Sequence, residues 1–180
     1  TLAGLTFTPD LFKVGFAGAP PTHMGRSAKF YRRFQKKSFR ELNEYSMKKL
    51  VVDWNDKEAF KQSYQKSPDN HVNKITKPLV IWAGEHDGRV FVVDVKDYAL
   101  KAQALDKRVS LFVDPKAKHS PNSKVSLEAY SYLLEKTLAE HLAGKMQTLD
   151  SKVDKTLIRY LKKNMLIDDN QLLTHAEPIK

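Results

Sequence analysis

The sequence contains no cysteine among its 180 residues, which excludes disulfide bonds, thiol catalysis, zinc ribbons and iron–sulfur clusters. It has no apolar run near the roughly 20 residues that a membrane-spanning helix needs. Its first residues also lack the basic segment and the long apolar stretch that are typical of a signal peptide, which says nothing about a longer parent protein. It also lacks the H-E-x-x-H zinc motif and the G-x-x-x-x-G-K phosphate loop. The first residue is Thr1 rather than Met, so we expect this chain to be the interior of a longer protein, whose compartment stays open.

The composition is that of a folded domain with a positive charge. Hydrophobic residues make up 41% of the chain and charged residues 29%. A chain of this length suits one domain that buries roughly 70% of its unfolded surface. The net charge is +10, and residues 26–49 supply much of it, with nine Lys and Arg against two Glu.

Five aromatic residues interleave with the cations of this basic segment, residues 26–49. Such a segment could track a nucleic-acid backbone and stack its bases, or attract acidic peptides to the rim of an active site. We favour a solvated helical insertion whose aromatic rings pack on the core, and we expect no specific nucleic-acid partner.

Apolar runs alternate with stretches of helical periodicity along the chain. Continuous apolar runs predict buried strands, and apolar residues spaced three and four apart predict helices. The expected strands are 14–19, 79–83 and 109–113, and the expected helices are 2–8, 41–50, 56–65, 95–105, 127–141 and 149–164. This alternation implies an α/β fold with a mostly parallel sheet flanked by helices.

The end of the chain reads as an addition to this fold. Gly144 is expected to end the helix before it, so we assign residues 1–144 to the domain and residues 145–180 to a C-terminal helical extension. Leu157 and Leu161 belong to an apolar stripe on the helix of this extension, whose other side is basic. That helix could lie on a membrane surface or on a partner, but we favour packing on its own domain.

Two of the expected strands lead to side chains that suit acid–base chemistry. The strand 79–83 leads to Asp87, and the strand 109–113 leads to His119. In open α/β sheets ligands bind at the carboxyl ends of the strands. A carboxylate beside an imidazole can fix its tautomer, so that the imidazole takes a proton from a nucleophile. We therefore expect the Asp87 carboxylate within hydrogen-bond reach of the His119 ring, about 2.6–3.2 Å.

The sequence GEHDGRV at residues 84–90 is followed by a helix, a strand and then DPKAKH at residues 114–119. This order of segments resembles the C-terminal part of the catalytic domain in the prolyl oligopeptidase family. The members of this family are serine peptidases of the α/β-hydrolase fold. The segments 8–20, 67–68 and 74–78 are similar to flanking parts of the same domain. The resemblance covers roughly residues 1–143 and implies the C-terminal part of an α/β-hydrolase catalytic domain, with Asp87 as the orienting acid and His119 as the general base. It implies no cofactor and no metal.

The nucleophile of that family is a serine in a G-x-S-x-G elbow, which this chain lacks. The resemblance places the serine just before Thr1, so we expect the fragment alone to be inactive. The implied function is peptide-bond cleavage together with the N-terminal part of the same protein or another chain. Two alternatives stay open: an esterase on the same fold, and a non-catalytic basic binding module derived from a hydrolase.

Overall fold

The computed structural model of the chain describes residues 1–27, 56–144, 146 and 151–173. Nearly all of the basic segment and the helix expected at 41–50 lie outside the described residues, so the alternatives raised for that segment stay predictions. The chain forms two compact units, Thr1–Pro20 with Val72–Lys180 in the first and Pro21–His71 in the second. The domain boundary expected at residue 144 stays a prediction.

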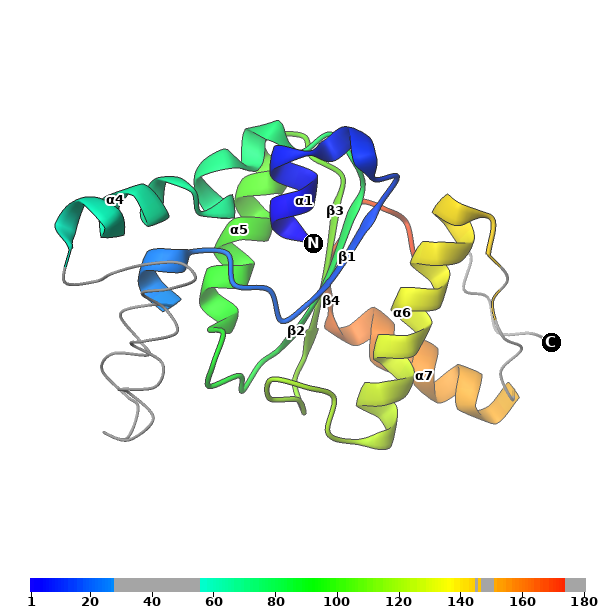
Figure 1. Ribbon diagram of the computed structural model, residues 1–180. Helices are drawn as coiled ribbons and strands as arrows, with labels where there is room; N and C mark the ends of the chain where they lie inside the picture. Colours follow the sequence, from blue (N-terminus) through cyan, green and yellow to red (C-terminus); the bar gives the residue numbers. More distant parts are fainter. Residues whose placement is uncertain (28–55, 145, 147–150, 174–180) are drawn as a thin grey trace. The chain divides into compact units, whose positions relative to one another are not determined.

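A four-stranded sheet is the framework of the first unit (Figure 1). Its strands lie in the order β1-β2-β3-β4, of which the first three run parallel and β4 runs antiparallel to β3. Their bounds are Gly15–Gly18 for β1, Leu79–Gly84 for β2, Val109–Asp114 for β3 and Met165–Asp168 for β4. The predicted α/β class with a mostly parallel sheet flanked by helices is confirmed.

Helices cover both faces of this sheet, with α1 and α5 on one side and α6 and α7 on the other (Figure 1). Among the described residues, no helix is long and apolar enough to cross a membrane. The bounds are Leu2–Phe7 for α1, Lys57–Gln65 for α4 in the second unit, Val92–Ala104 for α5, Lys124–Leu142 for α6 and Ser151–Asn164 for α7, with short 3-10 helices at Pro9–Leu11 and Pro68–Lys74. Each of these five α-helices confirms a helix expected from the sequence, whereas the two 3-10 helices were not expected.

Each face of the sheet has its own hydrophobic core. In β2, Ile81 belongs to the core under α1 and α5, whereas Trp82 belongs to the core under α6 and α7. Leu111 and Phe112 of β3 divide in the same way, and none of the four is more than 1% exposed. Because both faces are covered, the strands read as continuous apolar runs rather than as alternating patterns.

The helix of the C-terminal extension packs on its own domain, as favoured from the sequence. Leu157 and Leu161 of α7 are 1% and 0% exposed, and both belong to the core that contains Trp82 and Phe112. These two leucines of the apolar stripe are therefore covered within this chain.

The extension also supplies β4, a strand that the sequence did not predict. Four residues are too few to show a period of two, and the pairing of Asp168 with Ser110 joins distant parts of the chain. The Asp168 carboxylate accepts the backbone amide of Leu172 at 2.8 Å and the Ser110 hydroxyl at 3.3 Å. Buried Asn170 donates to the carbonyl oxygen of Leu79 at 3.0 Å. The extension therefore contributes to the sheet as well as adding a helix.

The end of α6 corrects one expectation. The residue that caps this helix is Ala143, which takes the left-handed conformation with φ 55, and not Gly144. The left-handed region favours glycine at such positions, which is why the sequence pointed to the neighbouring residue.

Candidate active site

Asp87 lies in the loop between β2 and α5, shortly after β2 ends at Gly84. Its carboxylate is almost fully buried, with 2% of the side chain exposed. One oxygen, Oδ1, accepts hydrogen bonds from the backbone amides of Arg89 at 2.7 Å and Val90 at 3.0 Å. These two bonds turn the chain toward α5 and fix the orientation of the carboxylate, which leaves Oδ2 for another donor.

The second oxygen of this carboxylate meets the predicted base. Oδ2 of Asp87 lies 2.9 Å from Nδ1 of His119, which follows β3. The His119 side chain is 38% exposed, so the ring stands between the buried carboxylate and solvent. A carboxylate at Nδ1 favours the tautomer with its proton there and leaves Nε2 as the acceptor. The structure brings the two predicted residues together, and their catalytic role stays a prediction.

Backbone contacts lock the two site loops to each other. A Cβ atom on Gly84 would lie 1.9 Å from the carbonyl oxygen of Lys118, the residue before His119. The backbone amide of His86 donates to the carbonyl oxygen of Ala117 at 3.0 Å. Because only glycine permits this approach, the Asp87 loop and the His119 loop can lie side by side.

A second buried carboxylate near the site was missed in the sequence. Asp114 is 0% exposed, and its Oδ1 accepts the backbone amide of Lys116 at 3.0 Å and the hydroxyl of Tyr160 at 2.6 Å. An aspartate that directly ends an apolar run is a signal for such a buried group. Nothing in the sequence connects it with Tyr160, which is 46 residues away on helix α7.

No described serine hydroxyl is hydrogen-bonded to the His119 ring. Ser123 caps α6, because its hydroxyl oxygen accepts the backbone amide of Ser126 at 3.3 Å and its hydroxyl donates to the Ser126 hydroxyl at 2.9 Å. Ser120 is exposed in the His119 loop and Ser27 lies in a helix. Within the described part of the chain, the one hydrogen-bond partner of His119 is Asp87.

The described residues contain no cluster of three or more His, Asp or Glu side chains that could hold a metal ion. The acid–base pair itself consists of one carboxylate and one imidazole. A carboxylate and an imidazole alone can orient and transfer a proton, which is the chemistry that this arrangement supports.

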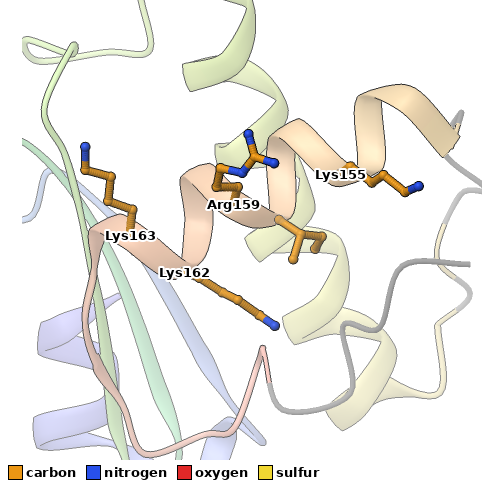
Figure 2. Close-up of a pocket in the computed structure, with 5 residues that line it drawn as sticks. Lys155, Arg159, Lys162 and Lys163 are labelled. Carbon is orange, nitrogen blue, oxygen red and sulfur yellow. The ribbon is translucent and has the colours of Figure 1, made fainter.

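A basic hollow of about 640 Å³ lies on the outer side of α7. Figure 2 shows its cationic side chains, which project from the helix in different directions and do not meet at one point. The lining residues are Lys155, Ile158, Arg159, Lys162 and Lys163. The polar side of this amphipathic helix therefore forms a positively charged surface, opposite the buried apolar stripe.

The model of the prolyl oligopeptidase family matches residues 1–145 of this chain. Among curated proteins, the dipeptidyl aminopeptidase BIII of Pseudoxanthomonas mexicana is 26% identical over 149 residues, which cover 83% of this chain and 21% of that protein. The C-terminal extension lies almost entirely beyond the part that the family model matches.

Solved structures share the fold. The acylaminoacyl peptidase of Pyrococcus horikoshii has a TM-score of 0.58 and 20% identity, over 86% of this chain and 23% of that one. An esterase of Pyrococcus furiosus has a TM-score of 0.51 and 19% identity, over 78% of this chain and 49% of that one. The chain thus spans only about a fifth to a quarter of the length of the two peptidases.

Proposed function

Since the chain belongs to the prolyl oligopeptidase family, we propose that it is the C-terminal part of the catalytic domain of a serine peptidase. In this proposal Asp87 is the orienting acid and His119 is the general base of a catalytic triad. The observation that carries the proposal is the 2.9 Å contact between Asp87 Oδ2 and His119 Nδ1, at the carboxyl ends of two parallel strands.

The chemistry follows from the orientation of the imidazole. With its Nδ1 proton held by Asp87, His119 Nε2 accepts the proton of a serine hydroxyl while the serine oxygen attacks the peptide carbonyl. His119 then gives this proton to the leaving amine, and an acyl-enzyme remains. In the second half of the reaction His119 takes a proton from water while the water oxygen attacks the acyl carbon. His119 then returns this proton to the serine oxygen as the ester bond breaks, which releases the acid product and restores the serine. The Asp87 carboxylate stabilises the imidazolium in both halves.

The serine comes from outside residues 1–180 in this proposal. It lies in a G-x-S-x-G elbow upstream of Thr1, in the N-terminal part of the same protein or in another chain. The substrate is a peptide, and the 180-residue chain alone is inactive, because loss of a triad serine costs several orders of magnitude in rate.

A fluorophosphonate probe, which labels activated serines, tests this proposal in the longer protein that contains this chain. We expect one probe molecule per active site in the wild type and little labelling of a His119→Ala variant. A His86→Ala variant is the matched control, because His86 is an exposed histidine in the neighbouring loop, and it should label like the wild type. The 180-residue chain alone should not be labelled.

Three results would overturn the proposal. An upstream sequence without a G-x-S-x-G elbow would favour the non-catalytic binding module. Full labelling of His119→Ala would remove His119 from the reaction. Turnover of esters without any turnover of peptides would make the protein an esterase on the same fold.

A further inference from the structure

Tyr160 connects the C-terminal extension to the loop that carries His119. It lies on α7, beyond residues 1–145 that the family model matches. Its hydroxyl donates a hydrogen bond of 2.6 Å to Oδ1 of Asp114, the last residue of β3. The 114–119 segment begins at this aspartate and ends at His119, so the contact lies at the start of the catalytic loop.

Asp114 joins both loops of the site through its backbone and its side chain. Its Oδ1 also accepts the backbone amide of Lys116 at 3.0 Å. Its carbonyl oxygen accepts the amides of Glu85 at 2.9 Å and Ala117 at 3.3 Å. A change in the position of Asp114 would therefore move the His119 loop and the Asp87 loop together.

The carboxylate of Asp114 depends on few donors. The residue is 0% exposed, and Oδ2 is buried without a hydrogen-bond partner among the described residues. A buried carboxylate is costly unless hydrogen bonds stabilise it. The Tyr160 hydroxyl is the only side-chain donor to Asp114 in the described part of the chain, so its removal leaves Oδ1 with the Lys116 amide alone.

Tyr160 is itself held firmly. Its neighbour Leu161 is 0% exposed in the core. The centroid of the Tyr160 ring lies 5.9 Å from that of the Phe112 ring in β3. Burial and the hydrogen bond to Asp114 raise the pKa of Tyr160 well above its usual range, so the hydroxyl stays protonated and remains a donor at any ordinary pH.

We propose that Tyr160 is a positioning residue for the reaction: through Asp114, its hydroxyl holds the 114–119 loop in the conformation that places the His119 ring against Asp87. This inference rests on the proposed function. It gives the C-terminal extension a role in catalysis without direct contact with the substrate.

The test compares Tyr160→Phe with the wild type of the longer protein. The variant keeps the ring and its packing and removes only the hydroxyl. A 1 Å misplacement of a catalytic group can cost about 100-fold in rate. Because the loss of one hydroxyl should displace His119 by less than this, we expect kcat to fall about tenfold, with KM almost unchanged. Tyr64→Phe is the matched control, because it removes a tyrosine hydroxyl in the second unit, and its kcat should stay at the wild-type value.

A double-mutant cycle shows whether Tyr160 acts through Asp114. In an Asp114→Ala background, Tyr160→Phe should cause no further loss of kcat, because the acceptor is already absent. Additive losses from the two substitutions would overturn the inference, as would an unchanged kcat in Tyr160→Phe alone.

A spectroscopic measurement separates failure of this inference from failure of the proposed function. The proton between His119 Nδ1 and Asp87 gives a proton NMR signal whose position and exchange with water report the geometry of the pair. We expect a shifted or faster-exchanging signal in Tyr160→Phe and no change in Tyr64→Phe, whether or not the protein hydrolyses peptides. An identical signal in Tyr160→Phe and the wild type would overturn the positioning role even if the peptidase activity is present.

Discussion

Oδ2 of Asp87 lies 2.9 Å from Nδ1 of His119, although the two residues are 32 positions apart in the sequence. The register of the parallel strands explains this proximity, because Gly84 at the end of β2 pairs with Asp114 at the end of β3. The two site loops therefore leave the sheet at the same level and on the same edge. The sheet brings the two loops together, and the conformation of each loop then places its side chain in the pair.

Neutralising the acid should stop catalysis while leaving the fold intact. Asp87→Asn keeps the size of the side chain and an oxygen that can accept the Arg89 and Val90 amides, but it no longer favours the reactive tautomer of His119. We expect kcat for peptide hydrolysis by the longer protein to fall about 10⁴-fold. The control is Asp10→Asn in the short 3-10 helix Pro9–Leu11, where Asp10 is exposed. A loss below about tenfold in Asp87→Asn would contradict the assigned role.

The close approach at Gly84 should tolerate no side chain. In Gly84→Ala the new Cβ would lie 1.9 Å from the Lys118 carbonyl oxygen, so the backbone must shift. We expect the free energy of unfolding to fall by about 1–3 kcal/mol and kcat to fall as well, measured by urea denaturation and by peptide hydrolysis.

Gly88 is the matched control for this substitution. It lies in the same loop, and a Cβ there would meet nothing within 4 Å. Gly88→Ala should therefore leave the stability within about 0.5 kcal/mol of the wild type. Equal losses in the two variants would show that the contact with Lys118 is not the cause.

The helix α7 should be an integral part of the first unit. Leu161→Ala removes a side chain that is 0% exposed, and we expect a loss of about 2–5 kcal/mol in the free energy of unfolding. Leu166→Ala is the control, because that leucine is 51% exposed. If Leu161→Ala costs no more than Leu166→Ala in urea denaturation, α7 does not contribute to the core.

The raised pKa of Tyr160 should appear in the pH dependence of stability. Burial and the hydrogen bond to Asp114 raise this pKa in the folded chain, whereas an unfolded tyrosine ionises near pH 10. The unfolded state therefore loses its proton first, so this contribution is complete below about pH 10 and is lost as the pH rises above it.

The midpoints of urea denaturation, measured between about pH 8 and 11, test this effect, because this range spans the usual pKa of tyrosine. The wild type should lose stability more steeply above pH 10 than Tyr160→Phe, which has no group to ionise at this position. Tyr64→Phe should follow the wild type. Parallel curves for the wild type and Tyr160→Phe would contradict the raised pKa.

The proximity of Asp87 and His119 could be predicted from the sequence, because it follows from strands that local patterns reveal. The runs that end before Asp87 and His119 are apolar and continuous, because both faces of β2 and β3 are covered, and they are recognisable as strands. The order of strands along the chain then brings the two loops to one edge of the sheet. This is why a distance within hydrogen-bond reach could be expected before the fold was known.

The parts that could not be predicted depend on packing between distant segments. β4 is only four residues long and is defined by its pairing with β3. The contact between Tyr160 and Asp114 depends on the angle at which α7 crosses the sheet, which no periodicity encodes. The residue that takes the left-handed conformation at the end of α6 is Ala143 and not Gly144, so residue preference alone did not locate this helix end.

The most direct measurement is kcat for a peptide substrate in the longer protein, compared between the wild type, His119→Ala and His86→Ala. If the pair of Asp87 and His119 performs the acid–base step, kcat falls by at least about 10³-fold in His119→Ala and stays near the wild-type value in His86→Ala. Because loss of a triad histidine costs several orders of magnitude in kcat, a kcat of His119→Ala within about tenfold of the wild type would contradict this role for the pair.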